Sequence, residues 1–484
     1  MTEQFPGAVL DLLDAAGDRT VFEHDGREVS GRQLLGMTRR VASGLRQRGL
    51  GPGHGVALLL GVGPEAFAAV VAAYTVGARV VGVRPGMTDH QRAALLRDAE
   101  VTAAVTDRLG AADVRPAGLV LALDELLAEP DDGRRPRVPA RPHDVARLIH
   151  TSGSTGVPKA CVQTYAAMTA AWTLRPEDWP PAVRELAGRL GRFLVFGTLA
   201  SQVMLEYGLL ALAAGGVLVS ADPPDLPGAL VRHRATASVV TVGRLNRLVT
   251  GLRAAPADLG ALRALIVSGS PLEPGRAEEA AQVLGPVVFH GYGQTETGMI
   301  SMATPADPPG SLGVPPVDLE VRGPSGRPVP AGTEGEIFVR TPSQGAGYWG
   351  RPGLSGEVFV DGWVRTRDLG SLDAQGRLWL SGRTRDVVIV DANVYYTGPV
   401  ERLLARHPAV SEAYVVAAPD DATGETVHAF VVPAAGRVPA LDELRALVTA
   451  RLGAACAPTR LTLVDEVPLT AAGKPDKRRL TRGS

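Results

Sequence analysis

The residues that most clearly could bind a ligand or take part in a reaction form a short segment rich in glycine and hydroxyl groups. It runs Thr-Ser-Gly-Ser-Thr-Gly-Val-Pro-Lys over 151–159, directly after an apolar run that ends at His150. Glycines let a chain turn tightly, hydroxyl and backbone N–H groups donate to phosphate oxygens, and a lysine adds a compact positive charge. The segment therefore predicts a loop that grips phosphate rather than a flexible Gly/Ser connector.

Other common catalytic patterns do not fit. The phosphate loop of ordinary NTPases needs Gly, four residues and then Gly-Lys-Ser/Thr, whereas Gly156 is followed by Val-Pro-Lys-Ala. The G-x-G-x-x-A pattern at 61–66 predicts only a tight turn into a helix, because Pro64 removes an N–H that would face a phosphate. The sequence has no G-x-S-x-G hydrolase elbow, no H-E-x-x-H and no Cys/His zinc spacing.

Further short motifs follow the 151–159 loop in a fixed order. They are SGSP at 268–271, HGYGQTE at 290–296, GEI at 335–337, DGW at 361–363 leading to Asp368, GR at 382–383, and PLT followed by GK over 468–474. As a set that spans nearly the whole chain, they resemble the AMP-forming adenylating enzymes. That superfamily contains the acyl- and aryl-CoA synthetases, the adenylation domains of peptide synthetases, and the luciferases.

The resemblance implies a domain plan and a reaction. The plan is an N-terminal adenylation core over 1–382 with a β-rich subdomain at about 305–382, a hinge at 383–385, and a mobile C-terminal domain over 386–484. In the first half-reaction a carboxylate attacks the α-phosphate of Mg·ATP to give an acyl-adenylate and pyrophosphate. The small domain then rotates, and an acceptor displaces AMP.

The resemblance also implies nucleotide-binding residues. The loop would cradle the β- and γ-phosphates, the glycine-containing segments would sandwich adenine, and Asp368 would accept hydrogen bonds from the ribose hydroxyls. The implied nucleotide-binding residues are Thr151, Ser152, Gly153, Ser154, Thr155, Gly156, Gly269, Ser270, Pro271, Gly291, Tyr292, Gly293, Thr295 and Asp368.

Five charged residues take the remaining implied roles. Glu296 would hold Mg2+, since a hard oxygen ligand suits a cation that bridges phosphates. Lys159, Arg383 and Lys474 are the implied catalytic residues, and Arg385 is the implied hinge. A lysine carried on a mobile domain would stabilise the charge that develops as pyrophosphate departs.

The scarcity of lysine supports the catalytic roles implied for Lys159 and Lys474. The chain has 50 basic residues, yet only Lys159, Lys474 and Lys477 are lysines. Two of the three fall where the resemblance requires a compact ammonium, which can approach a single oxygen where a planar guanidinium cannot. The alternative for Lys474 is a solubilising basic tail, because Lys477 and several arginines follow it.

The acid-binding region departs from the usual pattern. The segment 196–207 has neither the histidine of many acyl-activating relatives nor the aspartate that holds an amino group, which disfavours an α-amino acid. Ser201 and Gln202 offer hydrogen-bonding groups for a polar or compact acid. Glu206 either faces a pocket or points outward from a helix.

A second departure concerns the acceptor. Over 390–399, Asp391 and Ala392 replace a usual glycine pair, while Tyr396 and Gly398 replace Pro-x-Glu. In CoA ligases this loop helps to form the pantetheine tunnel, so CoA is one candidate acceptor and an amine is the other. The amine version includes an enzyme that activates nitrite for an aryl amine. A smaller departure is Arg367, where the pattern has glycine.

The elements that must position these residues follow from hydrophobic periodicity. Helices expected over 33–48 and 65–78 alternate with apolar strands, as is typical of a parallel sheet with helices on its faces. The expected strands of this part are 56–60, 145–150, 238–242 and 264–267. From residue 305 onward, turns rich in glycine and proline separate short strands at 319–322, 335–340, 363–365 and 377–380.

Beyond residue 382 a smaller unit is expected. Its helices begin near Pro399 and span 441–452, and its strands are 412–417, 427–432 and a short one near Leu461. The sequence thus predicts an α/β protein with a large multi-subdomain N-terminal domain and a small C-terminal α/β domain.

Composition excludes several function classes. A net charge of −1 gives no reason to expect nucleic acid or an anionic membrane as a partner. The apolar stretches 56–63 and 66–78 fall short of the roughly 20 residues that a membrane span needs. The first residues lack a signal-peptide pattern, and two cysteines cannot form a disulfide framework, so we expect a cytoplasmic enzyme. Of these two, Cys161 is expected to be an inert helix residue.

The sequence therefore favours a Mg2+- and ATP-dependent, AMP-forming ligase that activates a small organic or aromatic acid and transfers it to CoA or another nucleophile. The competing interpretations are an amine acceptor, a nucleotide-binding protein without catalysis, and a nucleic-acid binder. Retention of both Glu296 and Lys474 argues against lost catalysis, and the balanced charge argues against nucleic acid.

Overall fold

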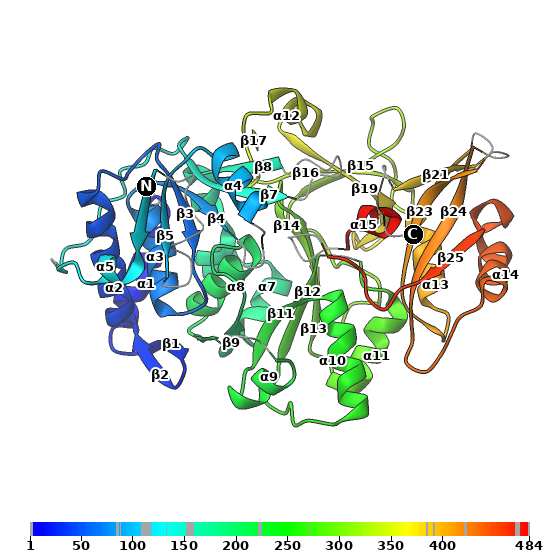
Figure 1. Ribbon diagram of the computed structural model, residues 1–484, viewed down its shortest axis with the longest axis horizontal. Coiled ribbons are helices and arrows are strands. Elements are labelled where there is room, and N and C mark those ends of the chain that lie inside the picture. Colours follow the sequence, from blue (N-terminus) through cyan, green and yellow to red (C-terminus); the bar gives the residue numbers. More distant parts are fainter. Residues whose placement is uncertain are drawn as a thin grey trace.

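The computed structural model describes residues 3–83, 87, 89–107, 118–131, 133–151, 159–220, 225–269, 271–383, 386–390, 393–420, 424–469 and 475–482. These residues form four β-sheets with helices packed on and between them (Figure 1). Three sheets belong to a large N-terminal part, and the fourth forms a small C-terminal part at the other end of the longest axis (Figure 1).

The first sheet has eight strands in the order β14-β13-β12-β11-β9-β10-β1-β2. Its inner strands pair in parallel, whereas β2 and β14 run antiparallel at the edges. The strands are β1 (Thr20–His24), β2 (Arg27–Ser30), β9 (Arg192–Val195), β10 (Val217–Ser220), β11 (Ala237–Thr241), β12 (Ala264–Ser268), β13 (Val288–Gln294) and β14 (Gly298–Ala303).

The second sheet has seven strands in the order β17-β8-β7-β4-β3-β5-β6. Strands β7, β4, β3, β5 and β6 are parallel, and β8 runs antiparallel to both of its neighbours. The strands are β3 (Gly55–Leu59), β4 (Arg79–Gly82), β5 (Val101–Thr106), β6 (Leu119–Ala122), β7 (Val145–Thr151), β8 (Lys159–Thr164) and β17 (Gly347–Tyr348).

Apolar helices fill the space between these two sheets. Every residue of α3 (Pro64–Thr75) except Glu65 is buried, because the helix contacts β4 of the second sheet and β1 of the first. Helix α8 (Gln202–Ala213) similarly packs against β9 and β10. Side chains of both sheets and both helices form one continuous hydrophobic core.

The remaining helices of the large part cover the outer faces and edges (Figure 1). They are α1 (Gly7–Ala16), α2 (Gly31–Gln47), α4 (Asp89–Asp98), α5 (Leu123–Leu127), α6 (Tyr165–Ala170), α7 (Pro181–Ala187), α9 (Gly228–Arg232), α10 (Val242–Ala254), α11 (Pro274–Leu284) and α12 (Pro352–Val358). Within the described ranges, no helix is both long enough and apolar enough to cross a lipid bilayer.

The third sheet is antiparallel and has the order β15-β16-β19-β18, with β20 paired to β19. Its strands are β15 (Asp318–Arg322), β16 (Gly335–Arg340), β18 (Phe359–Val360), β19 (Trp363–Leu372) and β20 (Leu378–Arg383). This sheet lies in the region expected to be a β-rich subdomain, and its strands β19 and β20 lead directly toward the small C-terminal part.

The fourth sheet forms the small part, in the order β22-β21-β24-β23 with β25 added in parallel to β24. Its elements are β21 (Val387–Val390), β22 (Asn393–Tyr396), α13 (Thr397–Ala405), β23 (Val410–Asp420), β24 (Gly424–Pro433), α14 (Leu441–Leu452), β25 (Arg460–Leu463) and α15 (Lys477–Arg482). It has a hydrophobic core of its own, built from its sheet and from α13 and α14.

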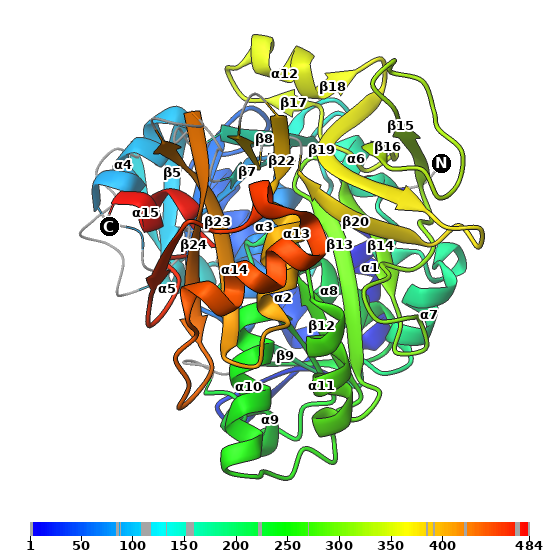
Figure 2. The ribbon, with the colours of Figure 1, turned by 90° about the vertical axis from the view of Figure 1, so that its right-hand side faces the viewer.

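The small part rests against the first sheet's outer helices, in front of them in Figure 2. Arg276 of α11 donates through Nη2 to the backbone oxygen of Val410 at 2.7 Å. Arg406, just after α13, donates through Nε to Oε1 of Glu273 at 3.0 Å. These polar contacts join the two parts at one place, and a cleft lies between the parts beside them.

The predicted α/β architecture is confirmed, and helix α14 has the predicted bounds. One local prediction is wrong. Cys161 lies in β8, not in a helix, because the chain after the 151–159 segment returns antiparallel to β7 and pairs Cys161 with Ile149. Alternating apolar residues at 160 and 162 fit a strand with one face on the core. The proposed domain boundaries at 382 and 386 stay a prediction.

Candidate functional site

A cleft of about 3130 Å³ separates the large part from the small part. Its walls include β13, the segment that follows it, β19 and β20 on one side, and α13, β23 and the start of α15 on the other. Most of the motif residues that the structure describes line this cleft, which is therefore the candidate functional site.

Strand β13 brings the HGYGQTE motif to the cleft. Its backbone packs closely against its neighbours. A Cβ on Gly293 would lie 2.4 Å from the backbone oxygen of Gly298, so only glycine fits there. A Cβ on Gly291 would lie 3.2 Å from the Tyr207 hydroxyl. Tyr292, Gly293 and Thr295 also line the cleft, as the sequence predicted for nucleotide-binding residues.

Asp368 is a buried carboxylate that three side chains bind. The hydroxyl of Tyr292 donates to its Oδ2 at 2.6 Å, and Nε2 of Gln294 donates to the same oxygen at 2.7 Å. Nε of Arg383 donates to Oδ1 at 2.8 Å. Asp368 is only 2% exposed, and burial together with this carboxylate raises the pKa of the Tyr292 phenol well above its ordinary value.

The antiparallel register explains why Arg383 reaches this carboxylate. Asp368 of β19 lies directly opposite Arg383 of β20. Sequence reasoning assigned Arg383 and Asp368 to the same nucleotide, which agrees with their contact. It gave no role to Gln294, although Gln294 stands inside the quoted HGYGQTE motif.

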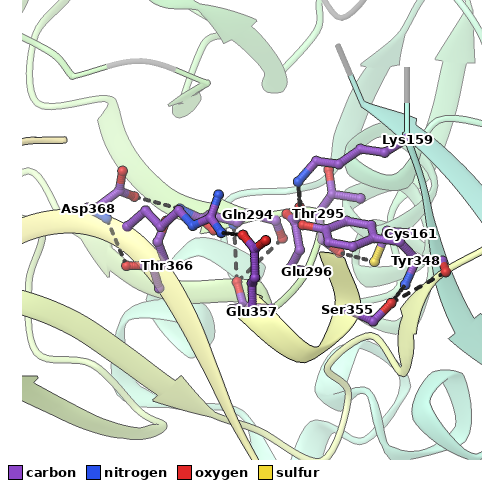
Figure 3. Close-up of polar contacts among 12 residues, drawn as sticks. Lys159, Cys161, Gln294, Thr295, Glu296, Tyr348, Ser355, Glu357, Thr366 and Asp368 are labelled. Carbon is purple, nitrogen blue, oxygen red and sulfur yellow. Dashed lines mark hydrogen bonds and ion pairs between the residues drawn. The ribbon is translucent and has the colours of Figure 1, made fainter. Parts of the chain in front are cut away.

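A second polar group forms around Glu296. Nζ of Lys159 lies 3.1 Å from Oε1 of Glu296, and the Tyr348 hydroxyl hydrogen-bonds to both side chains (Figure 3). The lysine nitrogen also lies 3.9 Å from the centre of the Tyr348 ring, a cation–π distance. Strand β17 carries Tyr348 next to β8, so residues almost 190 positions apart meet here.

The electrostatics favour an ionised glutamate. Burial alone would raise the pKa of Glu296, but Lys159 and the Tyr348 hydroxyl hold this pKa below its ordinary value of 4.5. Burial and the adjacent glutamate raise the pKa of Tyr348, so its hydroxyl remains a donor. Glu296 is therefore a negatively charged oxygen ligand that lines the cleft.

This donor set suits magnesium better than zinc or calcium. Among the described residues there is no cluster of three or more His, Cys, Asp or Glu side chains that could enclose a metal ion. Mg2+ is usually held by one or two carboxylates together with substrate phosphates, because it keeps most of its water shell. A single carboxylate beside Lys159, a lysine that the family resemblance implies at the phosphates, fits that arrangement.

The 151–159 segment joins two neighbouring antiparallel strands, β7 and β8. Thr151 ends β7, Lys159 begins β8, and their backbones lie opposite each other. The residues between them, 152–158, lie outside the described residues; they include the predicted phosphate-binding residues Ser152, Gly153, Ser154, Thr155 and Gly156. Of the described residues of this motif, Lys159 lines the cleft.

The Cys161 side chain is buried next to the Lys159–Glu296 pair and does not line the cleft. Its Sγ lies 3.7 Å from the backbone oxygen of Thr295. Burial and the nearby Glu296 carboxylate raise the pKa of the thiol well above its ordinary value. The thiol is thus protonated and unreactive, as expected of a buried structural cysteine.

The SGSP motif follows β12 at the carboxyl end of a parallel strand, where ligand sites of α/β sheets usually lie. Gly269 has a φ of +98°, a conformation that favours glycine. Gly269 and Pro271 both line the cleft, and Ser270 lies outside the described residues.

The predicted catalytic Lys474 and the predicted hinge Arg385 also lie outside the described residues. The residues that flank the C-terminal motif are described. Leu469 and Pro475 pair across an isolated bridge, and both line the cleft. Asp386, which follows the predicted hinge, lines the cleft as well.

The three predicted acid-pocket residues divide into two groups. Ser201 caps α8 by accepting from the backbone N–H of Met204 at 3.1 Å, and Ser201 and Gln202 both line the cleft. Glu206 is not among the residues that line the cleft; it pairs with Nη2 of Arg147 at 2.8 Å and borders a separate small cavity. Of the two alternatives for Glu206, the structure agrees with a side chain that faces a pocket, although this pocket is the small cavity and not the large cleft.

The described departures from the usual pattern have local explanations. Arg367 has a φ of +61° where the pattern has glycine, and its guanidinium pairs with Glu357 at 2.7 Å. At Gly398, a Cβ would lie 3.1 Å from the backbone oxygen of Ser381, so glycine lets α13 approach β20. Asp391 and Ala392 lie outside the described residues.

Comparison with known proteins agrees with this site. The family model of AMP-binding enzymes matches residues 13–349, and the model of the AMP-binding enzyme C-terminal domain matches residues 399–474. The chain therefore belongs to the AMP-binding enzyme family, and it is an AMP-forming ligase of the adenylating superfamily.

Individual relatives cover almost its full length. Feruloyl-CoA synthase of Amycolatopsis sp is 31% identical over 470 residues, covering 94% of each chain. The fatty acid–[acyl-carrier-protein] ligase ScoC of Streptomyces coeruleorubidus is 30% identical, covering 94% of this chain and 92% of its own. The structure of amide bond synthetase McbA from Marinactinospora thermotolerans is 32% identical, covers 99% of both chains and superposes with a TM-score of 0.88.

The Asp368 cluster yields a stability prediction. In Asp368→Asn, the amide NH2 meets groups that also donate, so at least one buried donor loses its acceptor. We expect the free energy of unfolding to fall by about 1–3 kcal/mol, measured as a lower midpoint in urea denaturation. Asp318→Asn is the matched control, because Asp318 pairs with Arg340 on the exposed side of the same sheet. Its loss should be about 1 kcal/mol or less. Equal losses in the two variants would contradict the role given to the Asp368 cluster.

Proposed function

We propose that this enzyme uses Mg·ATP to activate a small organic or aromatic acid as its acyl-adenylate, with release of pyrophosphate, and then transfers the acyl group to CoA or another nucleophile. The observation that carries the proposal is that one cleft is lined both by a buried carboxylate bound to Tyr292 and Arg383 and by the Lys159–Glu296 pair. These two groups suit opposite ends of a nucleotide.

We assign the nucleoside to the Asp368 end. Two carboxylate oxygens can accept from two ribose hydroxyls, with Arg383 able to follow the ribose or a phosphate. A Cβ on Gly269 would meet no atom within 4 Å, so this residue leaves open space for a flat base, which Tyr292 and Pro271 would border together with Gly291 and Gly293 of β13. Ser270 and Thr295 complete the nucleoside-binding residues in this proposal.

We assign the triphosphate to the Lys159 end. Residues 151–156 would supply backbone and hydroxyl donors, and Lys159 a compact charge. Glu296 would hold Mg2+, which when bound neutralises charge on the phosphate oxygens. Since Lys159 and Glu296 bind each other in this structure, both must exchange partners when nucleotide enters.

In the first half-reaction an oxygen of the substrate carboxylate forms a bond to the α-phosphorus. The bond from the α-phosphorus to its bridging oxygen breaks, and the electron pair leaves with pyrophosphate. Lys474 and Arg383 would stabilise the negative charge that builds on the phosphate oxygens in this step. Holding the carboxylate beside the phosphorus removes the entropic cost of a two-body encounter.

In the second half-reaction the acceptor forms a bond to the acyl carbon, the carbon–oxygen bond to AMP breaks, and the acceptor loses a proton. We propose CoA as the first candidate acceptor, supported by the likeness to feruloyl-CoA synthase. The likeness to the amide bond synthetase McbA over 99% of both chains supports an amine as the second. The amine-acceptor proposal includes nitrite as the smallest activated substrate, in which case it replaces the organic acid and is transferred to an aryl amine.

We also propose that the enzyme is located in the cytoplasm. Cys161 and Cys456 are both buried free thiols, which is the state expected of cysteines in a reducing compartment.

The central test is pyrophosphate release from ATP across a panel of carboxylates and nitrite, with CoA and amines offered separately. We expect release with at least one acid, and consumption of either CoA or the amine to identify the acceptor. Absence of release with every acid would remove the proposed function. Release without CoA consumption would select the amine acceptor.

Lys474 is expected to act in the first half-reaction. Lys474→Ala should lower the rate of adenylate formation roughly 100- to 1000-fold while ATP binding, measured by titration calorimetry, changes little. Lys474→Arg should restore little activity, because a planar guanidinium cannot replace a compact ammonium at one oxygen. Adenylation at the normal rate in Lys474→Ala would contradict this role.

Glu296 is expected to set the magnesium requirement. Glu296→Gln keeps the shape of the side chain but removes its charge, so the Mg2+ concentration for half-maximal pyrophosphate release should rise by roughly tenfold or more. Glu357→Gln is the control, since Glu357 is an exposed carboxylate that pairs with Arg367. A parallel shift in both variants would point to general electrostatics instead of metal binding.

A further inference from the structure

The aromatic ring of Tyr348, in β17, is anchored beside the cleft. The residue is only 5% exposed, and its ring belongs to a small hydrophobic cluster with side chains of β8, α12, β18 and β19. Within this cluster it meets the ring of Phe359 edge to face, with 5.6 Å between the ring centres. Because side chains from several elements hold the ring, the position of its hydroxyl is fixed as well.

The backbone around Tyr348 is tied to the same two residues that its hydroxyl contacts. Tyr348 pairs with Cys161 of β8, two positions beyond Lys159 on that strand. The backbone N–H of Gly345 donates to the backbone oxygen of Glu296 at 2.8 Å. A Cβ on Gly345 would lie 2.6 Å from Sγ of Cys161, so glycine permits this close approach. The segment that carries Tyr348 therefore holds the backbone of Glu296 as well as its side chain.

The Tyr348 hydroxyl connects two opposite charges. It accepts a hydrogen bond from Nζ of Lys159 and donates one to Oε1 of Glu296 (Figure 3). All three residues line the cleft, and the Glu296 and Lys159 side chains are 11% and 20% exposed. A ligand in the cleft can therefore reach both charged groups while the hydroxyl stays bound to them.

Nucleotide binding would take away one of the two side chains that bind the Glu296 carboxylate in the described ranges. In the proposed function Lys159 turns to the phosphates, whereas the Tyr348 hydroxyl can keep its hydrogen bond to Oε1. A buried carboxylate without a donor is costly and would turn back to the lysine. With the hydroxyl in place the carboxylate keeps its orientation, which is what hydrogen-bond partners of metal-binding groups generally provide.

We propose that Tyr348 is a positioning residue for the triphosphate end of the nucleotide site, where its hydroxyl holds the Glu296 carboxylate in place after Lys159 has moved to the phosphates. The inference rests on the proposed function, because it concerns the group that would hold Mg·ATP. The nucleoside end does not depend on Tyr348, since Asp368 and its three partners form a separate hydrogen-bonded group.

The test compares two ligands on one enzyme. AMP has the base, the ribose and the α-phosphate of ATP but lacks the β- and γ-phosphates. The dissociation constants of AMP and of Mg·ATP are measured by titration calorimetry for the wild type and for Tyr348→Phe. We expect the constant for Mg·ATP to rise about tenfold in the variant and the constant for AMP to change by about twofold or less. The ratio of the two constants, measured on one preparation, does not depend on how much protein is folded.

A double variant tests whether Tyr348 acts through Glu296. Glu296→Gln removes the charge that the hydroxyl stabilises, so adding the tyrosine change to it should weaken Mg·ATP binding by about twofold or less. A further tenfold loss in E296Q/Y348F would show that the two residues act independently. That result would overturn the inference.

Tyr165→Phe is the matched control. Tyr165 is fully buried and does not line the cleft, and its hydroxyl donates to the backbone oxygens of Tyr74 at 3.1 Å and Ala78 at 2.8 Å. Its loss should lower the midpoint of urea unfolding but leave the ratio of the two dissociation constants at the wild-type value. A shift of the ratio in both variants would mean that it reports lost stability and not the position of Glu296.

The outcomes separate the two claims. If the wild-type enzyme does not bind Mg·ATP, the proposed function fails and the inference fails with it. If the wild type binds both ligands and Tyr348→Phe keeps the wild-type ratio, Tyr348 serves only to pack β17 against β8. In that case the proposed function stands and the inference is overturned.

Discussion

The arrangement of the cleft depends on one buried carboxylate, that of Asp368. Its partners come from β13 of the first sheet and from β20 of the third, so its hydrogen bonds join the two sheets at the point where the chain leaves for the small C-terminal part. A buried charge is costly unless it is hydrogen-bonded, and three donors stabilise this carboxylate here. The same donors keep both oxygens oriented toward the cleft wall.

The three lysines illustrate how the chain uses a scarce residue. Lys159 pairs with Glu296 at one end of the cleft. Lys477 begins α15 and lies 2.6 Å from Oε1 of Glu401 and 3.3 Å from Oδ2 of Asp386. Burial alone would lower the pKa of Lys477, but these two carboxylates raise it. This half-buried lysine therefore ties the C-terminal segment to α13 and to the start of the small part, three residues beyond Lys474.

Much of the architecture could be predicted from the sequence, because apolar periodicity is a local property. Strands β3, β7, β11 and β12 of the two large sheets and helix α14 follow from it. Most of the motif residues that the structure describes also line one cleft. For the segments after β12 and at the end of β13 the reason is that parallel strands place their carboxyl ends on one edge. Cys161 was assigned to a helix because short apolar runs do not distinguish a strand from a helix without their pairing partner.

What could not be predicted are the contacts between residues far apart in the sequence. Tyr348 stands in no recognised motif, and its hydroxyl meets Lys159 and Glu296 only because β17 pairs with β8. Nothing in the sequence singled out Arg147 within its apolar strand, and two alternatives stayed open for Glu206 within an apolar helix. Their ion pair depends on how α8 packs behind the second sheet, which no local pattern contains.

The Lys159–Glu296 contact has a consequence for how ligands enter. A nucleotide that captured Lys159 alone would leave a negative glutamate facing its phosphates, and a metal ion that captured Glu296 alone would leave an uncompensated lysine beside it. In the proposed nucleotide site each ligand would therefore improve the affinity for the other, and by thermodynamic linkage the improvement would be mutual. The ion pair would make the Lys159 end of the cleft selective for a metal–nucleotide complex over either component, before any chemistry begins.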